Sequence, residues 1–538
     1  MIRSVSGEIG RWRLIAWLLT GVVLVPVGVI LSAWITPEWA AWRHLLDTVL
    51  PTLIRNTGIL IVGVIAWVWL LGVGLAWLTA LCDFPGRRFF DWALILPLAM
   101  PAYVLAFTWL GLLDYGGPLQ LGLARRFGAN GYWFPDIRSP GMVVFFFALS
   151  LYPYVYMLAR AAFAGQGRRM LEAARILGRT PWGAFWHAAL PMARPAIAAG
   201  CALAAMEALA DFGAVSVFGF QTFTTAIYKA WYGMFNLPAA TQLASLLLLF
   251  VLAALTVERR MRGRARYFAS DGHAPTARER IVLTGMAGWL ATGVATLVFG
   301  LAFAVPMTQL AIWALGRIGQ DLDARYWSLL GHTLLLGGGA ALLASLAALI
   351  LGLIRKRHPE DRPIRLAVRL ASSGYALPGS VLAVGVMLAL IAIGKALGTT
   401  GGTNGALGAG VGALLLAYLA RFLAVAMGPV ESGLERIRPA ILEAAQGLGS
   451  DLWEQIRRIH LPLLRPGLLT AILLVLIEVM KEMPATLMLR PFGWDTLAVR
   501  IHEMTAEGEW ERAALPAVTL VLIGVWPVIL LVRKTARR

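Results

Sequence analysis

Two stretches of this chain carry the same pattern: EAARILGRTPWGAFWHAALPMARP at residues 172–195 and EAAQGLGSDLWEQIRRIHLPLLRP at residues 443–466. Every matched position is separated from its counterpart by one constant spacing, that from Glu172 to Glu443, which we call the repeat offset; Trp182 and Trp453 also keep it. Because this offset is close to half of the 538 residues, the simplest explanation is a tandem fusion of two copies of one unit. The chain is therefore expected to consist of two related halves.

The repeat extends beyond this stretch, since the segment that begins at Pro101 returns at Pro378 as Pro-x-x-Val-Leu-Ala. Between the halves lies one extended polar segment rich in arginine, which is typical of a linker. We expect a first repeat over 1–257, a cytoplasmic linker over 258–281 and a second repeat over 282–538. Each repeat contains one of the two matched loops, at about 165–191 and about 435–462.

The composition indicates whether the chain lies in water or in lipid. Hydrophobic residues make up 59% of the sequence and charged residues 14%, and the mean hydropathy is +0.72, values that a water-soluble surface does not tolerate. We predict an all-α polytopic membrane protein with about twelve transmembrane helices, six in each half. The expected spans are 13–33, 54–80, 92–112, 141–163, 195–215, 240–257, 282–305, 332–354, 370–393, 406–427, 466–488 and 513–533.

Basic residues are concentrated at both termini and in every second loop, including both matched loops. Since such residues are retained on the cytoplasmic side, both termini and the matched loops are predicted to be cytoplasmic. This distribution also explains most of the net charge of +18. A nucleic-acid partner, which would require a basic face on a soluble domain, is not expected.

No catalytic site is predicted in the chain. It has no G-x-x-x-x-G-K-[ST] motif, because Gly394 and Lys395 are followed by alanine, and no arrangement typical of a hydrolase or of a metal site is found. The two cysteines, Cys82 and Cys201, are interpreted as structural. We expect neither a cofactor nor a metal bound by this chain; any ATP hydrolysis would require a partner that binds ATP and magnesium.

The matched loops suggest a surface for a soluble partner protein. In the first loop, a short helix over 170–177, a turn at Gly178 and a second helix capped by Thr180 are expected; in the second, Gly449 and the pair Ser450–Asp451 take the same places. A rigid helical hairpin that presents small alanines and a glutamate suits docking to a soluble protein. The proposed docking residues are Glu172, Ala173, Ala174, Gly178, Leu190, Pro191, Glu443, Ala444, Ala445, Gly449, Ile459, Leu461 and Pro462.

The pattern Glu-Ala-Ala, three residues, Gly, nine residues, Ile, one residue, Leu-Pro resembles the signature loop of type I permeases of binding-protein-dependent ABC importers. The second copy satisfies it fully, with Ile459 in place, whereas the first has Ala188 at that position. The resemblance implies that the loops form coupling helices held by two copies of a cytoplasmic ABC ATPase. It also implies an extracytoplasmic substrate-binding protein as a partner, and a lipid bilayer around the spans.

Longer segments are similar to the fused ferric-iron permeases of bacteria. They comprise Leu96–Val104, Leu113–Pro118, Trp133–Ser139, Leu151–Tyr156, Ala210–Ser216 and Lys481–Thr486. This resemblance implies transport of ferric iron. The identity and chemical form of the solute stay open, because related permeases transport other small solutes. The alternatives are ferric ion, ferric ion with a small anion, and thiamine.

Four carboxylates fall inside predicted spans: Glu207, Asp211, Glu478 and Glu482. Each pair is spaced i, i+4, and the second pair follows the first at the repeat offset. Charges in lipid are costly, so these side chains either line a translocation path or lock helices together, for instance with Lys481 neutralising Glu478 or Glu482. A proton-coupled secondary transporter that uses these carboxylates is the competing class of function.

Overall fold

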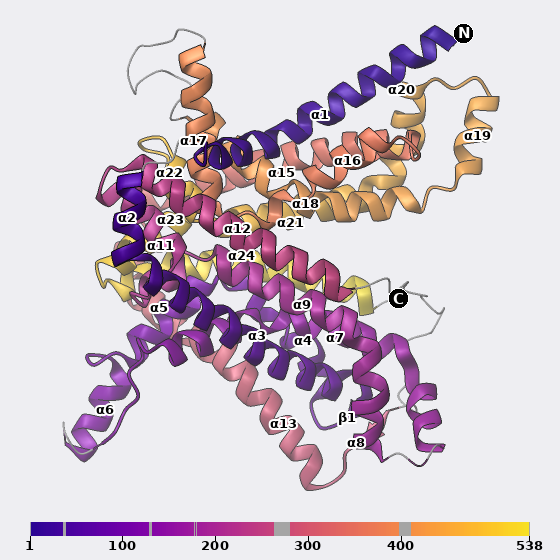
Figure 1. The fold of residues 1–538 in the computed structure, drawn as a ribbon. Coiled ribbons are helices and arrows are strands. Elements are labelled where there is room, and N and C mark those ends of the chain that lie inside the picture. Colours follow the sequence, from indigo (N-terminus) through magenta and orange to yellow (C-terminus); the bar gives the residue numbers. More distant parts are fainter. Residues whose placement is uncertain are drawn as a thin grey trace. The chain divides into compact units, whose positions relative to one another are not determined.

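The computed structural model describes residues 2–35, 39–128, 132–176, 178, 180–262, 280–396 and 410–536. These residues are almost entirely helical (Figure 1), which confirms the all-α fold class. Two short strands in the described ranges, β1 (Cys82–Asp83) and β2 (Ile281–Val282), pair in parallel. Most of the predicted linker lies outside the described residues.

Ten helices of the described chain are long and apolar enough to cross a membrane, and eleven if one bent pair counts as a single span. The bent pair corresponds to the predicted span 92–112, which is wrong as a straight helix because the chain turns by 94° between Ala99 and Ala102. Pro101 at this break has no N–H to continue a helix. The twelfth predicted span, 513–533, lies in α24 and is not among the ten; the side chains at 527, 528 and 530–536 are outside the description.

The described residues form two compact units. Unit 1 comprises residues 1–43, 227–248 and 322–500, and unit 2 comprises residues 44–226, 249–321 and 501–538. The helices of unit 1 are α1 (Ile2–Ser32), α15 (Ala324–Arg357), α16 (Arg362–Ala371), α17 (Gly379–Ala396), α18 (Val411–Glu435), α19 (Pro439–Gly447), α20 (Leu452–Gln455), α21 (Leu461–Lys481) and α22 (Pro484–Leu489).

The helices of unit 2 are α3 (Leu50–Leu81), α4 (Arg87–Ala93), α5 (Ala102–Leu113), α6 (Pro118–Phe127), α7 (Pro140–Ile176), α8 (Pro181–Ala184), α9 (Leu190–Ala210), α10 (Gly213–Val217), α13 (Met286–Phe299), α14 (Val305–Asp321) and α24 (Trp510–Ala536). Residues of α2 (Trp39–Thr48), α11 (Phe223–Tyr228), α12 (Leu237–Arg262) and α23 (Leu497–Ala506) are divided between the units. The units therefore do not follow the two sequence repeats, and the repeat boundaries stay a prediction.

In unit 1, the first helix of the chain packs on helices of the second half. Figure 1 shows α1 along α16, and α1 also contacts α17. Thr20 Oγ1 donates to the Ala367 carbonyl at 3.1 Å, and Arg13 pairs with Asp361 at 2.8 Å. A Cβ at Gly385 would lie 2.7 Å from the Pro26 carbonyl oxygen, so this glycine allows α17 to approach α1 closely.

In unit 2, the second half likewise contributes its first helices to the bundle of the first half. The chain leaves the linker through β2, and Leu283 N donates to the Asp83 carbonyl at 2.9 Å. Thr292 Oγ1 donates to the Pro85 carbonyl at 2.7 Å, and α14 contacts α5 of the first half as well as α24. Backbone and side-chain hydrogen bonds thus fix the start of α13 to the β1–α4 segment.

The sequence repeat returns as a repeat of element bounds. Helices α8, α9 and α10 begin one repeat offset before α20, α21 and α22, respectively. Between the first two of each set lies a π-helical turn, Phe185–Ala189 in one half and Ile456–His460 in the other. In both halves the chain therefore follows the same backbone path: from the matched loop, through the spanning helix (α9 or α21), to the short helix after it (α10 or α22).

Candidate functional site: the repeated hairpins and the carboxylates of the spans

The second hairpin, residues 443–460, is a helix, a glycine turn and a capped helix, as predicted. Helix α19 ends at Gly447, and Gly449 has φ of 81°, a left-handed conformation that favours glycine. Asp451 then accepts a hydrogen bond from Glu454 N at 2.7 Å as the N-cap of α20. The glycine turn and the cap that directly follows it thus fix where α20, the second helix of the hairpin, begins.

Side-chain bonds fasten the two arms of this hairpin together. Ser450 Oγ donates to the Ala445 carbonyl at 2.7 Å, and Gln455 Nε2 donates to the Ser450 carbonyl at 3.1 Å. A bond of 3.1 Å also joins His460 Nδ1 and the Gln455 carbonyl oxygen, which links α20 to the π-helical turn. These bonds therefore tie the turn to the end of α19 and α20 to the turn on either side of it.

The outer surface of the second hairpin exposes apolar side chains. Leu448 is 89% exposed and Trp453 is 68% exposed, and Glu443 and Ala444 are also exposed. Ile459 and Leu461 are half-buried toward the bundle, while Pro462 in the first turn of α21 is exposed. Large exposed apolar side chains on one short hairpin are typical of a surface that a protein partner covers.

The first hairpin, residues 172–189, has the same turn with a different first arm. The expected short helix is wrong here, because α7 runs without a break from Pro140 to Ile176 and contains Glu172, Ala173 and Ala174 in its last turns. The second half breaks at this point because Arg438 is extended before Pro439. The side chains at 166–175 lie outside the described residues.

Beyond its helix the first hairpin follows the predicted path. Gly178 has φ of 79°, and Thr180 Oγ1 accepts a hydrogen bond from Gly183 N at 3.1 Å, which confirms it as a cap. Leu190 is buried and Pro191 lies in the first turn of α9. The left-handed glycine, the cap and the π-helical turn therefore occur in both hairpins, one in each compact unit.

Two residues that the sequence did not single out orient the hairpins. In unit 2 the Trp77 ring meets Phe185 edge to face, with centroids 4.6 Å apart, so α3 supports the π-helical turn. In unit 1 Lys356 donates to the carbonyls of Leu434 and Ile437, the latter at 2.9 Å, and satisfies the C-terminal end of α18. Lys356 lies just beyond the predicted span 332–354, and this position is the sequence feature that could have indicated its contact with the end of α18.

Of the four carboxylates, Glu207 and Asp211 lie in unit 2. Both side chains are half-buried, and Asp211 directly follows the last residue of α9. Its Oδ1 accepts a hydrogen bond from Ala214 N at 2.8 Å, and its carbonyl accepts one from Thr224 Oγ1 at 2.6 Å. Asp211 thus terminates a spanning helix and caps α10.

Glu478 and Glu482 lie in unit 1, and both are in ion pairs. Lys481 Nζ is 3.0 Å from Glu478 Oε1, one of the two locks that the sequence suggested. Glu482 Oε2 is 2.8 Å from Arg421 Nη1, and the side chains of Arg421 and Glu482 are only 9% and 4% exposed. Glu482 Oε1 also accepts a hydrogen bond from Ala485 N at 3.0 Å and so caps α22. Arg421 is not among the residues predicted above, although a single arginine inside an apolar span is a sequence feature that could have indicated a buried ion pair.

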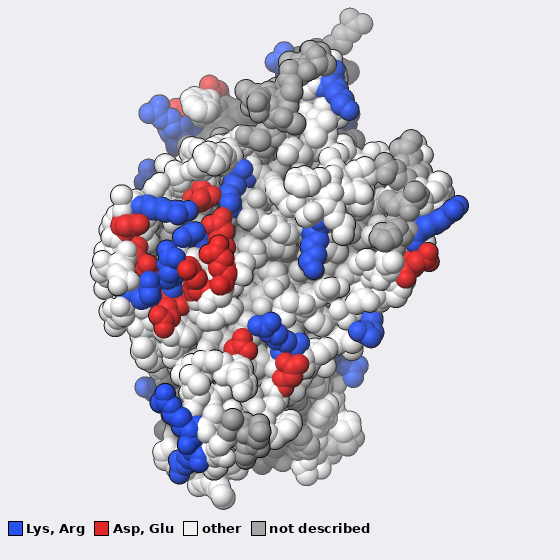
Figure 2. Space-filling model, turned by 90° about the vertical axis from the view of Figure 1, so that its left-hand side faces the viewer, with Lys and Arg blue, Asp and Glu red and all other residues white. Residues whose placement is uncertain are grey.

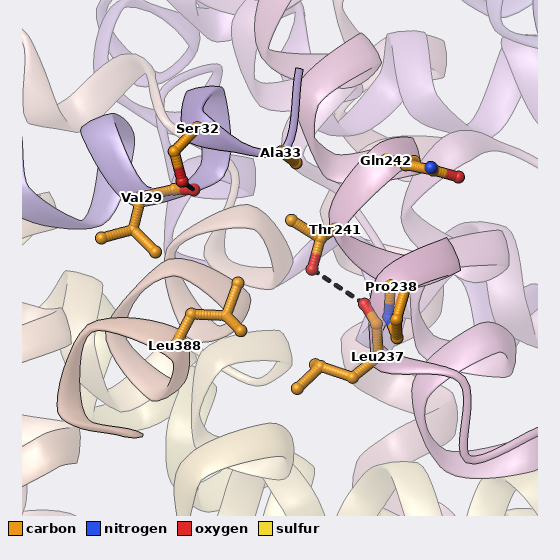
Figure 3. A pocket seen from close by; sticks show the side chains of 8 residues that line it. All are labelled: Val29, Ser32, Ala33, Leu237, Pro238, Thr241, Gln242 and Leu388. Carbon is orange, nitrogen blue, oxygen red and sulfur yellow. Dashed lines mark hydrogen bonds between the residues drawn. The ribbon is translucent and has the colours of Figure 1, made fainter. Parts of the chain in front are cut away.

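Each unit also contains a cavity. In unit 2 a cavity of about 380 Å³ is lined by polar residues, among them Arg138, Ser216, His502 and Glu507, and to the same extent by apolar residues and glycines. In unit 1 a cavity of about 290 Å³ lies between α1, α12 and α17 (Figure 3). Its hydroxyl groups are used internally: Ser32 donates to the Val29 carbonyl and Thr241 to that of Leu237. The cavity in unit 1 thus has mainly apolar walls, with Gln242 as a further polar residue of its lining.

Charged side chains gather on one face. Figure 2 shows acidic and basic groups intermixed in one dense patch, while most of the rest of this face is uncharged. In unit 2 Arg317 pairs with Asp321 at 3.2 Å and Arg512 pairs with Glu509 at 2.7 Å. The residues that the structure describes include no group of three His, Cys, Asp or Glu side chains that could hold a metal ion.

Comparison with known proteins now adds to this geometry. A family described as "Binding-protein-dependent transport system inner membrane component" matches residues 70–263 and 340–536, once in each half. The chain is 29% identical to the Fe(3+)-transport system permease protein FbpB 2 of Haemophilus influenzae over 89% of both chains. It is 23% identical to the ferric transport system permease protein FbpB of Actinobacillus pleuropneumoniae over 80% of this chain and 63% of that one.

A shorter relative matches one part of the chain. The molybdenum transport system permease protein ModB of Escherichia coli is 29% identical over 34% of this chain and 78% of its own length. A single-length permease therefore corresponds to about one half of this protein, in line with a double-length fused form. With both family matches together covering well over half of its residues, the chain belongs to the binding-protein-dependent transport system inner membrane components.

Proposed function

We propose that this chain is the complete transmembrane pathway of an ATP-driven importer for ferric iron. Two copies of a cytoplasmic ABC ATPase dock on the two hairpins, and an extracytoplasmic binding protein delivers the iron. The chain resides in the inner membrane with both termini in the cytoplasm. The observation that carries the proposal is the repeated left-handed glycine and cap at Gly178–Thr180 and Gly449–Asp451, one hairpin in each unit.

The hydrogen bonds within the second hairpin and the π-helical turns of both hairpins support a mechanical role. When the ATPases close around ATP they move the hairpins, and the π-helical turns pass the displacement into α9 and α21 because turn and helix are continuous. The two halves then expose the pathway alternately to the two sides of the membrane. No bond of the solute is made or broken, so the chain acts as a transport subunit and ATP with magnesium is used by the partner.

Glu207, Asp211, Glu478 and Glu482 are proposed to border the pathway as structural charges. The capping bonds of Asp211 and the ion pairs of Glu478 and Glu482 support this reading, because a carboxylate that is paired with Lys481 or Arg421 binds a passing cation weakly. Weak binding suits transport, since the solute must also leave. A resident metal site is not part of the proposal.

The test is uptake of radioactive ferric iron by iron-starved cells that lack this chain but retain its partners. Wild type restores uptake, and a double variant with valine at Gly178 and Gly449 does not, although it reaches the membrane. Failure of the wild type to restore uptake would show that iron is the wrong solute, and thiamine would be tested next. Uptake that persists without the ATPase and stops with an uncoupler would instead establish proton coupling.

A further inference from the structure

We propose that helix α16 carries a binding site for an anionic phospholipid of the cytoplasmic leaflet, in which Arg365 and Arg369 hold the phosphate of the headgroup. The inference goes beyond the proposed function and does not depend on the solute. It takes from that function only the orientation in which the N-terminal end of α1 faces the cytoplasm. It assigns a ligand to a helix that the proposed transport mechanism leaves without a task.

Helix α16 has one buried face and one basic side. The buried side chains, which lie where the helix packs in unit 1, are Ile364, Ala367, Val368 and Ala371. The three arginines of the helix are Arg362, Arg365 and Arg369, and because they follow one another at i, i+3 and i+7 they lie along one side. Arg362 and Arg369 are exposed, and Arg365 is half-buried. The basic side of α16 is therefore accessible from outside the bundle.

The register of α16 against α1 shows how deep these arginines lie (Figure 1). Helix α1 is apolar enough to cross a membrane and carries no charged residue between Arg13 and its end at Ser32. Asp361 pairs with Arg13, and the Ala367 carbonyl accepts a hydrogen bond from Thr20, so the two helices run side by side in the same direction. From Arg13 to Thr20 the helix rises by about 10 Å, at about 1.5 Å per residue. The end of α16 thus lies beside the apolar part of α1.

The segment after α16 keeps this direction. A Cβ added at Gly374 would lie 3.3 Å from Val23 Cγ1 on α1. Arg369 stands in the chain between Ala367, whose carbonyl meets Thr20, and Gly374, so its level is between those of Thr20 and Val23. At that level the uncharged stretch of α1 has already begun. The backbone at Arg369 is therefore inside the span and not at its edge.

An exposed guanidinium at this level requires an anion. A charge in hydrocarbon is costly unless it is paired, and the long stem of an arginine lets it reach back toward the headgroups. In the described ranges of the chain, no acidic side chain pairs with Arg365 or Arg369. Asp361, at the start of the helix, is occupied by Arg13 and by Ile364 N. A headgroup phosphate supplies the missing negative charge at this depth.

Exposed apolar side chains near the arginines suit the rest of a phospholipid. Leu366 follows Arg365 in α16 and is 50% exposed. On α1 three apolar side chains are exposed between the levels of its two contacts with α16: Leu14, Trp17 and Leu18. Leucines of this kind accommodate acyl chains, and tryptophan is typical of the membrane interface. A soluble phosphate would use the arginines alone, whereas a phospholipid covers both kinds of surface, so a phospholipid is the occupant.

The first half contains a matched helix with one charge fewer at these positions. Counted back from the matched Pro101 and Pro378, the residues of α4 that correspond to Arg365, Leu366 and Arg369 are Arg88, Phe89 and Trp92. Phe89 is 43% exposed, similar to Leu366. An arginine followed by an exposed apolar side chain is thus common to both units. Tryptophan is an uncharged residue that the membrane interface accepts, so Arg369→Trp is a substitution that the matched helix already carries.

The first experiment measures lipid binding to the purified full chain in detergent by native mass spectrometry. The probes are phosphatidylglycerol and phosphatidylcholine with the same dioleoyl chains. We expect wild type to bind its first phosphatidylglycerol several-fold more tightly than phosphatidylcholine, and Arg369→Gln to lose most of this preference. Arg369→Lys should keep most of it, because the charge stays. The matched control is Arg325→Gln, which removes an exposed arginine from the start of α15 and should change nothing.

Equal affinity of wild type for the two lipids would overturn the proposal, as would an equal loss in Arg369→Gln and Arg325→Gln. An excess of glycerol 3-phosphate should not displace the lipid; displacement would show that the site binds a phosphate without its acyl chains. If Arg369→Gln cannot be purified, Arg369→Trp takes its place, with the same loss of preference expected.

The second experiment tests the depth of α16 in vesicles of phosphatidylglycerol and phosphatidylcholine. A spin label is placed at Leu366→Cys in a chain with Cys82→Ser and Cys201→Ser. Leu18→Cys on α1 and Leu448→Cys on the second hairpin are the references for lipid and for water, since these leucines are 65% and 89% exposed. The label at 366 should be accessible to oxygen, as at 18, and shielded from a water-soluble nickel complex.

Nickel accessibility at 366 equal to that at 448 would place α16 in water and overturn the proposal. Both experiments use the chain without ATPase, binding protein or iron. A failure of lipid binding therefore leaves the proposed importer function untouched, and a failure of iron uptake leaves the lipid site untouched.

Discussion

Asp211 and Glu482 occupy equivalent positions of the two halves, and each accepts a hydrogen bond from the backbone N–H three residues ahead, that of Ala214 or Ala485. Each carboxylate directly follows a spanning helix of the same length, α9 or α21, and caps the short helix that follows. An acidic side chain at this position satisfies donors that water would otherwise satisfy. In both halves, an acidic side chain thus connects the end of a spanning helix to the first turn of the short helix that follows.

The left-handed glycines of the hairpins give the first prediction. Gly449→Ala places a Cβ at φ of 81°, which costs about 1–2 kcal/mol for an L-residue and disturbs the turn. Less ATPase is expected to co-purify with this variant. Gly447→Ala is the control, since Gly447 lies two residues earlier at the end of α19 with open space around it. Equal loss of ATPase from both variants would contradict the argument.

The cap of α20 gives the second. Asp451→Ala removes the acceptor for Glu454 N and is expected to weaken the hairpin by about 1 kcal/mol. ATPase affinity, measured by titration onto the solubilised chain, should fall, and Asp451→Asn should keep most of it because an asparagine also caps. If alanine and asparagine behave alike, the cap has no role in docking.

The third concerns Gly379. Gly379→Ala forces a methyl group against Glu482 and Arg421, and overpacking of this kind costs about 1–3 kcal/mol. The midpoint of thermal unfolding of the solubilised chain is expected to fall. Ala102→Gly, the reciprocal change at the matching position of the first half, lacks this clash and serves as comparison. An unchanged midpoint in Gly379→Ala would show that α17 can move away from the ion pair.

The fourth uses the buried thiol of Cys82, which lies just after α3. Burial raises the pKa of this thiol to about 11, because a thiolate is poorly solvated there. In a Cys201→Ser background, we expect almost no reaction with a maleimide at pH 7.5 until detergent unfolds the chain. Rapid labelling of the folded protein at that pH would show that the β1 segment opens readily.

The fifth concerns Asp361, which caps α16 outside the spans. The hydrogen bond from Arg13 holds the pKa of this carboxyl below its ordinary value, with a smaller contribution from Ile364 N. A depressed pKa stabilises the folded state above the ordinary aspartate pKa of about 3.9. The contribution is lost as the pH falls through the folded-state pKa.

Asp361→Asn should therefore unfold at a lower temperature than wild type at pH 7. The difference should shrink as the pH falls below the ordinary aspartate pKa of about 3.9 and through the lower folded-state pKa, where the wild-type carboxyl also becomes protonated. A difference that is independent of pH would show that the charge of Asp361 does not matter to the contact with α1.

Much of this arrangement follows from the sequence. The glycine and cap residues of each hairpin were predicted because φ near 80° and an N-cap side chain are local requirements that single residues meet. The continuity of α7 into the first hairpin was not predicted, since the same Glu-Ala-Ala pattern begins a separate helix only where Pro439 follows an extended residue. The 94° turn before Ala102 was missed because hydropathy measures length and not direction.

The helical class, the membrane environment, the two-fold repeat and the turns of both hairpins follow from the residues alone, because hydropathy and local backbone preference act over neighbouring residues. The grouping of helices into compact units, with α1 on α16 and α13 beside α4, does not follow from them. Nor does the pairing of Glu482 with Arg421 and of Glu478 with Lys481. Such pairings depend on packing between segments far apart in the chain, where shape and buried charge select one partner among several that the sequence allows.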